Sequence, residues 1–290
     1  MKKHQIFLQR HVFGNFNLNI LYKVCIIFDI LRWRPFNQYT KNILITGHTD
    51  GSLNHWHATS KKILHSLIEP DNHIYAMDFK IDGTSFATGG RDGQLRVYDE
   101  NKISKMQIFQ EGSNTPTHKN RIYSLKFLPD DQNLLISGGW DKVVLLWDVR
   151  TGRSENFLYG PMICGDSLDY RDGLILTGSW RSEDQLELWD IKTMKRIQVI
   201  KWVEFDENIL SNQKSFVYTC QFQKGKGNLI AAGSCGNNEI RLFDMNRNYE
   251  CVDGVKDLEQ GVFSIDWANC TEKTVFGYGG SNGLCGLMSL

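Results

Sequence analysis

Ser137-Gly138-Gly139-Trp140-Asp141 leads, six residues on, to Trp147-Asp148, and this stretch decides the fold. A strand ends at a glycine, a tight turn carries an acid, and the next strand reaches a large apolar residue. The same series of glycine, turn acid or amide, and apolar residue recurs at Gly47/Asp50/Trp56, Gly89/Asp92/Tyr98, Gly178/Glu183/Trp189, Gly233/Asn237/Phe243 and Gly279/Asn282/Met288. A repeat of roughly 40–50 residues made of short strands predicts a β-propeller.

Each repeat is expected to supply four short strands. In the third repeat these are residues 121–127, 134–137, 143–147 and 155–159, which alternate polar and apolar side chains between Gly, Pro, Asn and Asp turns. Since about six such repeats are present, we predict an all-β protein, a β-propeller of about six four-stranded blades. A seven-bladed arrangement and an incomplete ring are the alternatives.

Residues 15–21, Asn-Phe-Asn-Leu-Asn-Ile-Leu, alternate polar and apolar side chains. The last repeat stops at Leu290 after only three expected strands, and a bare sheet edge invites aggregation. We therefore expect residues 15–21 to supply the outer strand of the last blade and to close the ring. The predicted domains are an N-terminal extension, 1–14, and a propeller, 15–290. The alternative is that residues 1–25 form an extension outside the fold.

Bulk composition narrows the range of partners. The 290 residues include 33 basic and 33 acidic side chains, so no excess of positive charge points to nucleic acid. No apolar run approaches the roughly 18–20 residues that cross a bilayer, and we expect no signal peptide. Seven scattered cysteines without a Cys-x-x-Cys pair are typical of reduced thiols. We expect an intracellular protein, cytoplasmic or nuclear, with no nucleic acid partner, no membrane insertion and no cofactor.

Four repeats carry the dipeptide Trp-Asp or a close variant at their apolar position: Trp147-Asp148, Trp189-Asp190, Tyr98-Asp99 and Phe243-Asp244. They resemble the WD-repeat family, and the resemblance covers nearly the whole chain from about residue 28. In that family a His, a strand Ser or Thr, a turn Asp and the Trp form a hydrogen-bonded set that locks each blade. The resemblance implies such a set in the third repeat, from His118, Ser137, Asp141 and Trp147. Ala232 and Tyr278 replace the hydroxyl residue in the last two repeats, so we expect those blades to depend more on apolar packing.

The resemblance also implies where partners bind. In WD-repeat proteins the residue just before the turn acid points to the partner-binding face, and here Arg91 and Trp140 hold this place, with Trp180 near it. Exposed Trp and Arg often anchor interfaces. The alternative is that Trp140 and Trp180 pack against neighbouring loops.

A second set of candidate residues comes from the first strand of each repeat, which lines the channel of a propeller. These residues are Asp29, Tyr75, Tyr123, Asp166, Tyr218 and Phe263. Aromatic rings beside two carboxylates suit an extended peptide that carries Lys or Arg. The alternative is ordinary packing around a water-filled channel.

Residues 147–150, Trp-Asp-Val-Arg, match the Trp-Asp-x-Arg pattern of WD-repeat substrate receptors of cullin-type ubiquitin ligases. The resemblance makes Arg150 the ligase contact. The next repeat has Lys192 at this place, and Lys does not replace Arg in a bidentate contact.

Catalytic and metal-binding patterns are weak. Residues 279–283 fit Gly-x-Ser-x-Gly, but they lie in a predicted hairpin turn, whereas a nucleophile elbow needs a strand entering a helix. His48, His55 and His57 could hold a metal, yet two His at i and i+2 are more often a polar strand face. We predict no catalytic residues and no metal site; an enzyme that uses channel carboxylates is the least favoured alternative.

Together these patterns predict a non-enzymatic scaffold or adaptor that presents a rigid propeller face to protein or peptide partners within a hetero-complex. The ubiquitin-ligase receptor is the alternative. The predicted partner-binding residues are Arg91, Tyr75, Tyr123, Trp140, Trp180, Tyr218 and Phe263.

Overall fold

The computed structural model describes residues 28–35, 42–202, 214–269 and 274–290. These residues divide into two compact units, the first ending at Tyr159 and the second running from Gly160 to Leu290. The predicted N-terminal extension and the predicted closing strand, 15–21, lie outside the described residues. No helix in the described part of the chain is long and apolar enough to span a membrane.

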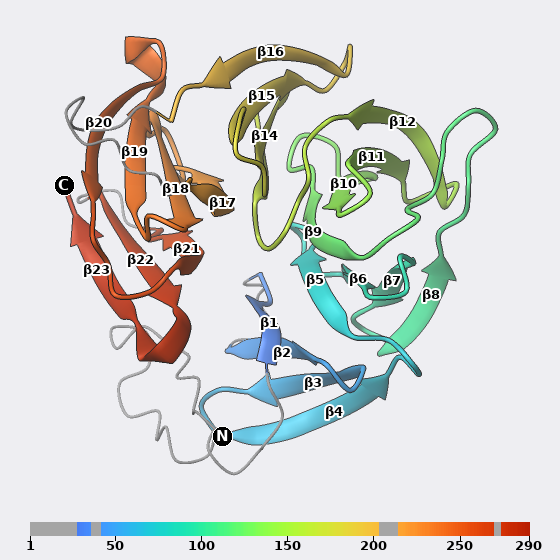
Figure 1. Cartoon of the computed structure of the whole chain (residues 1–290). Helices are drawn as coiled ribbons and strands as arrows, with labels where there is room; N and C mark the ends of the chain where they lie inside the picture. The colour runs from blue at the N-terminus through green and yellow to red at the C-terminus, as the bar shows by residue number, and fades with distance from the viewer. Residues whose placement is uncertain (1–27, 36–41, 203–213, 270–273) are drawn as a thin grey trace. The chain divides into compact units, whose positions relative to one another are not determined.

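The first unit holds three antiparallel sheets of four strands each, drawn in blue to green in Figure 1. Their strands are β1 (Phe28–Trp33), β2 (Ile43–His48), β3 (Ser52–His57), β4 (Lys62–Ile68), β5 (Ile74–Phe79), β6 (Ser85–Gly90), β7 (Leu95–Asp99), β8 (Ser104–Ile108), β9 (Ile122–Phe127), β10 (Leu134–Gly139), β11 (Val143–Asp148) and β12 (Arg153–Tyr159). Each strand pairs with the strand before or after it in the chain, so every sheet is a meander.

The second unit holds two further sheets of four strands and one of three described strands. Their strands are β13 (Leu168–Arg171), β14 (Leu174–Gly178), β15 (Leu186–Asp190), β16 (Lys195–Ile200), β17 (Phe216–Phe222), β18 (Leu229–Cys235), β19 (Ile240–Asp244), β20 (Glu250–Val255), β21 (Val262–Trp267), β22 (Val275–Gly280) and β23 (Cys285–Ser289). Short 3₁₀ turns occupy Met245–Arg247 and Ser281–Gly283. The prediction of an all-β architecture built from four-stranded propeller blades is confirmed.

The last strand of each four-stranded sheet is the most exposed. In β9 Ile122, Leu125 and Phe127 are buried, whereas nearly all of β4 is exposed. The core of the first unit lies between consecutive sheets, where Leu95 and Val97 of β7 join the buried side chains of β9 and β11. Burying one such aliphatic side chain stabilises a fold by about 1.5–3 kcal/mol.

The glycine of the sequence repeat lies where two consecutive sheets approach each other most closely. A Cβ atom at Gly89 would lie 2.7 Å from the Ile122 side chain of the next sheet, and one at Gly233 would lie 2.6 Å from Val262. The same close approach occurs at Gly47 against Ile74 and at Gly178 against Val217. A larger residue would push the sheets apart, and this explains why glycine recurs at this position.

Hydrogen bonds also join the first strands of neighbouring sheets. Asp78 Oδ2 on β5 accepts from Phe127 N on β9 over 2.9 Å. Asp169 Oδ2 on β13 accepts from Phe222 N on β17 over 2.8 Å. Both acids lie three residues after a predicted channel-lining residue. Within each unit, therefore, the sheets are held at a defined spacing by polar contacts as well as by apolar packing.

Candidate functional site

Four side chains of the third sheet, β9–β12, form one hydrogen-bonded set. Trp147 Nε1 donates to Ser137 Oγ over 2.8 Å. Ser137 Oγ lies 2.7 Å from His118 Nε2, and His118 Nδ1 lies 2.8 Å from Asp141 Oδ2. Trp147 is 2% exposed, so the set supplies the acceptor that a buried indole N–H requires. The structure thus brings together the four residues of the hydrogen-bonded set expected from the sequence.

Two opposing effects act on the pKa of the Asp141 carboxylate. Burial acts to raise its pKa, but the hydrogen bond and charge of His118, together with the backbone N–H groups of Lys119 and Val143, outweigh burial and lower the pKa. Lys119 N donates to Asp141 Oδ2 over 2.9 Å. An ionised carboxylate therefore ties the segment before β9 to the turn between β10 and β11.

The second sheet, β5–β8, has a different acceptor. Tyr98 OH donates to Glu69 Oε1 over 2.8 Å, and the Thr88 hydroxyl donates to the same oxygen. Arg96 NH1 lies 3.2 Å from Glu69 Oε2, and Arg96 NH2 contacts Asp92. Burial and the Glu69 carboxylate raise the pKa of the Tyr98 phenol, which stays protonated as a donor. Glu69 was not expected from the sequence, because the hydrogen-bonded set of the family has a His rather than a Glu before the first strand of the repeat.

The fifth sheet, β17–β20, contains a buried ion pair. Arg241 NH2 lies 3.1 Å and 3.0 Å from the two carboxylate oxygens of Glu239, and Arg241 is fully buried. Trp202 Nε1 and Ser215 Oγ donate to Glu239 Oε1 over 2.7 Å and 2.8 Å. The expectation that this blade depends more on apolar packing did not include this buried charged pair. In the sixth sheet the packing of Trp267 against Phe276, with ring centroids 4.8 Å apart, agrees with that expectation.

In the first unit the predicted turn residues and the predicted strand residues meet in one row of side chains. The Arg–aromatic row, as we name it, consists of His73, Tyr75, Arg91, Arg121, Tyr123 and Trp140. The Tyr75 and Tyr123 rings are stacked with centroids 5.0 Å apart and planes 14° apart. The Trp140 ring lies 5.6 Å from the Tyr123 ring at 46°. All three rings are half-buried, so each packs against a neighbour and also reaches solvent.

Two arginines flank these rings. The Arg121 guanidinium carbon lies 5.5 Å from the Trp140 ring centroid, and its NH1 donates to Tyr123 OH over 3.4 Å. That hydrogen bond, with the nearby Tyr123 and Tyr75 phenols, raises the pKa of Arg121. Arg91 NH1 donates to His73 Nε2 over 3.2 Å. The row therefore combines aromatic area with fixed positive charge.

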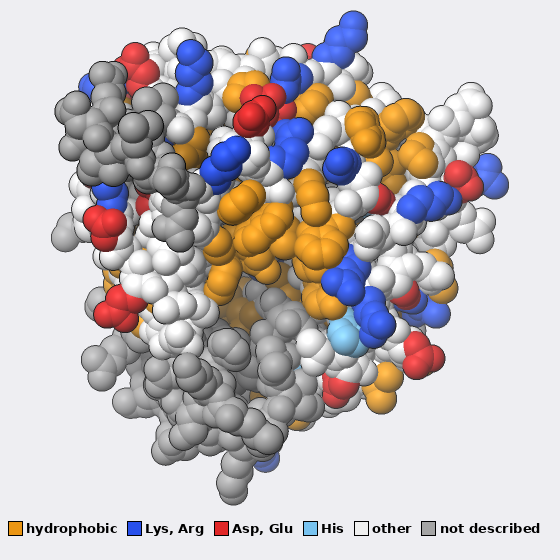
Figure 2. Space-filling view, viewed as in Figure 1, with side chains coloured by type: hydrophobic (Ala, Val, Ile, Leu, Met, Phe, Trp, Pro, Cys, Tyr) orange, Lys and Arg blue, Asp and Glu red, His pale blue; other side chains and the backbone are white. Residues whose placement is uncertain are grey.

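The second unit carries a separate aromatic cluster, which consists of Trp180, Phe216, Tyr218 and Phe263. The Trp180 and Phe216 rings are stacked with centroids 5.1 Å apart. Tyr218 meets Trp180 edge-on at 5.8 Å and Phe263 edge-on at 4.8 Å. Phe263 is 36% exposed. Figure 2 shows hydrophobic side chains exposed on one face of the molecule, with Lys, Arg and His side chains beside them.

The arginine next to the aromatic cluster in sequence forms its hydrogen bonds with residues outside the cluster. Arg181, which follows Trp180, donates to Ser179 Oγ over 2.9 Å and to Glu187 Oε2 over 2.7 Å. Glu187 is 1% exposed, so this arginine belongs to the interior of its own sheet. Of the two expected channel carboxylates, Asp166 is half-buried in the second unit, and the Asp29 side chain lies outside the described residues.

Comparison with known proteins agrees with this geometry. A family model described as WD domain, G-beta repeat matches residues 61–99 and 110–148. Residues 61–99 and 110–148 are therefore WD repeats. Its relatives include the guanine nucleotide-binding protein subunit beta of Solanum tuberosum, 26% identical over 229 residues, and that of Zea mays, 25% identical over 229 residues. Each comparison covers 76% of this chain and 56% of the relative, so this WD-repeat chain spans a little over half the length of these curated relatives.

Arg150 of this WD-repeat protein lies at the end of β11 and its side chain is 68% exposed. Its Nε lies 3.1 Å and its NH2 2.6 Å from the two oxygens of Asp148. Those hydrogen bonds with Arg150 are the main reason why the Asp148 pKa is lowered. The guanidinium is thus held in a fixed place while most of its side chain faces solvent.

The three histidines weighed as metal ligands have other partners. His48 Nε2 lies 2.9 Å from Thr46 Oγ1, the hydroxyl that accepts from Trp56 Nε1. His55 Nε2 lies 3.0 Å from Glu100, and His57 Nδ1 lies 2.8 Å from Ser60. In the described part of the chain no three His, Cys, Asp or Glu side chains gather as a metal site.

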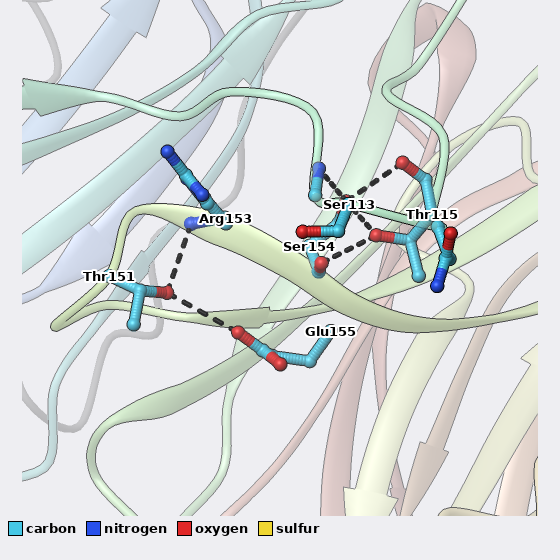
Figure 3. Close-up of a pocket in the computed structure, with 8 residues that line it drawn as sticks. Ser113, Thr115, Thr151, Arg153, Ser154 and Glu155 are labelled. Atoms are coloured by element: carbon cyan, nitrogen blue, oxygen red, sulfur yellow. Dashed lines mark hydrogen bonds between the residues drawn. The ribbon is translucent and has the colours of Figure 1, made fainter.

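A pocket of about 540 Å³ lies where residues 112–115 run along β12 (Figure 3). Its hydroxyl groups bond to one another and to the backbone: Thr115 Oγ1 lies 2.7 Å from Ser154 Oγ, and Thr151 Oγ1 accepts from Arg153 N over 3.3 Å. Gln110 forms an isolated parallel bridge with Arg153. The pocket therefore lies between the connecting segment 112–115 and the edge strand β12. The sequence did not indicate this place.

Proposed function

We propose that this WD-repeat protein is a protein-interaction subunit that binds partners through its half-exposed aromatic surfaces. The observation that carries this proposal is that Trp140 and Trp180 each lie in a set of packed but solvent-reaching rings on the turns and first strands of the blades. Trp, Tyr and Arg are the residues that most often dominate binding energy at protein interfaces.

The rigidity of the blades supports this role. Trp140 and Tyr123 belong to the sheet that the His118–Asp141 and Trp147–Ser137 bonds hold together. A surface whose rings are already packed loses little conformational freedom on association, so more of the contact energy is available for affinity.

The names of the relatives support a place in a larger assembly. The Solanum tuberosum and Zea mays proteins are named as subunits of guanine nucleotide-binding proteins. By that likeness we infer that this chain also works as one component of a hetero-complex. We place that complex inside the cell, in accord with cysteines that are thiols throughout the described residues.

A native-lysate pull-down with quantitative mass spectrometry tests the proposal. Trp140→Ala/Tyr123→Ala alters the Arg–aromatic row, and Trp180→Ala/Tyr218→Ala alters the aromatic cluster. Phe157→Ala/Tyr159→Ala removes two exposed rings of β12, 41% and 66% exposed, and is the matched control.

We expect a defined set of proteins to be lost from at least one surface variant and kept by the control, with melting temperatures close to wild type for all. Identical protein sets for wild type and both surface variants would overturn the proposal.

Arg150 supports one second candidate, a substrate receptor of a cullin-type ubiquitin ligase. The supporting observation is the exposed guanidinium that Asp148 holds in place. Arg150→Lys keeps the charge but removes the planar fork, so a bidentate ligase contact should be lost in that variant. Equal recovery of ligase subunits with wild type and with Arg150→Lys would exclude this role.

A further inference from the structure

Arg91 and Arg121, the two arginines of the Arg–aromatic row, differ from Arg34, Arg96 and Arg150 of the first unit in the partners that hold them. Arg34, Arg96 and Arg150 each lie within 4.0 Å of a carboxylate oxygen. In the described part of the chain Arg91 and Arg121 have no ion pair; the side chains they contact are the neutral His73, Tyr123 and Trp140. Among the described residues of the unit, therefore, no carboxylate pairs with either arginine.

The hydrogen-bond directions make this row rich in donors. An arginine can only donate, so His73 Nε2 accepts from Arg91 and carries no proton. The neutral ring then carries its proton on Nδ1, which lies 3.2 Å from the Tyr75 hydroxyl and donates to it. Tyr75 OH is thus the acceptor in this contact. The acceptors His73 Nε2 and Tyr75 OH therefore receive hydrogen bonds from donors of the row itself.

A further donor in the row lacks an acceptor. Trp140 Nε1 is buried and has no hydrogen-bond partner among the described residues. A buried polar group without a partner costs about 1–3 kcal/mol. A ligand that brings acceptor oxygens to this place would improve the polar contacts of the row.

Acids close to the row in sequence are already engaged. Asp92, next to Arg91, contacts Arg96. Asp141, next to Trp140, lies 2.8 Å from His118 and accepts from Lys119 N. Neither carboxylate compensates the two arginines, so an anionic partner would meet positive charge that the unit itself leaves open.

The spacing of the rings suits an extended peptide. Two contacts of 5.0 Å and 5.6 Å separate the three ring centroids in turn, with Arg91 at the Tyr75 end and Arg121 at the Trp140 end. In an extended chain, residues i, i+2 and i+4 share one face and cover about 13 Å. A peptide with acids at i and i+4 and an aromatic residue at i+2 matches this order of charge, ring and charge.

We propose that the Arg–aromatic row binds an acidic peptide segment, with one carboxylate on Arg91, one on Arg121 and an apolar or aromatic side chain on the rings between them. This inference rests on the proposed function and names the chemistry of the partner. It departs from the sequence-based expectation of a Lys- or Arg-bearing peptide, because the charged side chains of the row, among the described residues, are arginines rather than carboxylates.

Fluorescence anisotropy on the full chain tests the proposal with three labelled probes. The first is the peptide Gly-Asp-Ser-Phe-Ser-Asp-Gly, the second has Asn in place of both Asp, and the third is a uridine 12-mer. Arg91→Gln/Arg121→Gln removes the two charges of the row. Lys102→Gln/Arg153→Gln removes two exposed charges of the first unit outside the row and is the matched control.

We expect wild type and the control to bind the Asp peptide, the Asn peptide to bind about tenfold more weakly or worse, and the row variant to lose the preference for Asp. Loss of binding in the control as well would mean a general charge effect and would overturn the proposal. Tighter binding of the uridine oligomer than of the Asp peptide would identify a nucleic acid surface instead and would overturn it too.

Failure of this inference and failure of the proposed function give different results. If no probe binds but the lysate proteins are still lost from Trp140→Ala/Tyr123→Ala, the interaction surface stands and the acidic-peptide assignment is wrong. If the lysate proteins are unchanged and the Asp peptide still binds through Arg91 and Arg121, the site stands and the larger complex does not.

Discussion

The third and fifth sheets both accept a hydrogen bond from an indole N–H, but with different chemistry. In the third sheet Trp147 donates to the neutral hydroxyl of Ser137, which His118 and Asp141 hold in place. In the fifth sheet Trp202 donates directly to the Glu239 carboxylate. In the third sheet the charged group, Asp141, lies at a turn. In the fifth sheet a complete ion pair, Glu239 and Arg241, lies in the interior.

This difference changes what each sheet loses when one member is removed. Asp141 lies at a half-buried turn, where water can replace part of what a substitution removes. Arg241 is fully buried, so loss of Glu239 removes a carboxylate that lies 3.0 Å from a cation screened from water. A buried ion pair adds little net stability while intact, yet breaking it is strongly destabilising. The fifth sheet should therefore respond more sharply to single substitutions than the third.

The largest effect is expected from Glu239→Gln. The substitution keeps the shape of the side chain but removes the carboxylate charge beside the buried Arg241, which should lower the free energy of unfolding by about 3–5 kcal/mol. Urea denaturation would give the loss, and hydrogen–deuterium exchange would locate it in β17–β20.

Glu183→Gln, at an exposed turn of the second unit, is the matched control and should change stability by less than about 0.5 kcal/mol. Equal stability of the two variants would show that the ion pair does not hold the fifth sheet. Glu239→Gln/Arg241→Met should recover much of the loss, because it removes the stranded cation.

A smaller loss is expected from Asp141→Ala in the third sheet. His118 and the Lys119 N–H lose their acceptor, which should cost about 1–3 kcal/mol in the free energy of unfolding. Faster amide exchange should appear in β9–β12, while Glu111→Ala, an exposed acid of the same unit, should leave exchange unchanged. Destabilisation as large as that of Glu239→Gln would contradict the difference drawn between the two sheets.

The stabilising effect of Asp141 should also depend on pH. The Asp141 pKa is lowered in the folded state from the ordinary value of about 3.9. Its contribution is therefore present above the unfolded pKa and is lost as the pH falls through the folded one. The stability difference between wild type and Asp141→Asn should be constant from about pH 7 to 5 and shrink below about pH 4. A stability difference between wild type and Asp141→Asn that grows as the pH falls would refute the lowered pKa of Asp141.

The smallest effect is expected from Trp202→Phe. The ring that lies 4.7 Å from the Arg241 guanidinium is largely kept, and only the hydrogen bond to Glu239 is lost. We expect a loss of about 0.5–1.5 kcal/mol in the free energy of unfolding. A much larger loss would mean that the indole, rather than the ion pair, holds the fifth sheet together.

Several features of the fold follow from local sequence and were predictable. The repeated glycine marks the close approach to the next sheet, as at Gly89 and Ile122. Hydroxyl residues such as Ser137 and Thr177 accept from the Trp of the same repeat, Trp147 and Trp189. These features are predictable because the interacting residues sit at constant spacing on adjacent strands.

A second signal was present in the sequence but was not used. The residue two positions before the large apolar residue is polar or charged in four repeats: Asn54, Arg96, Glu187 and Arg241. In the structure each of these side chains takes part in the polar set of its own sheet. A charged residue at a position that is buried, as it is in these four repeats, indicates an internal ion pair, because burial of an unpaired charge is too costly.

The sequence by itself determined the type of the repeats, the four-strand pattern of a blade and the residues of the Trp147 set, because these depend on periodicity and turn chemistry over short distances along the chain. Only the tertiary structure decided that Glu69 accepts from Tyr98, and that Arg121 and Trp140 join Tyr123 and Tyr75 in one row. These contacts join segments that are distant in sequence, and their geometry is set by how one sheet packs on the next. The charge of a binding surface is therefore decided by the packing of neighbouring blades, which no single repeat contains.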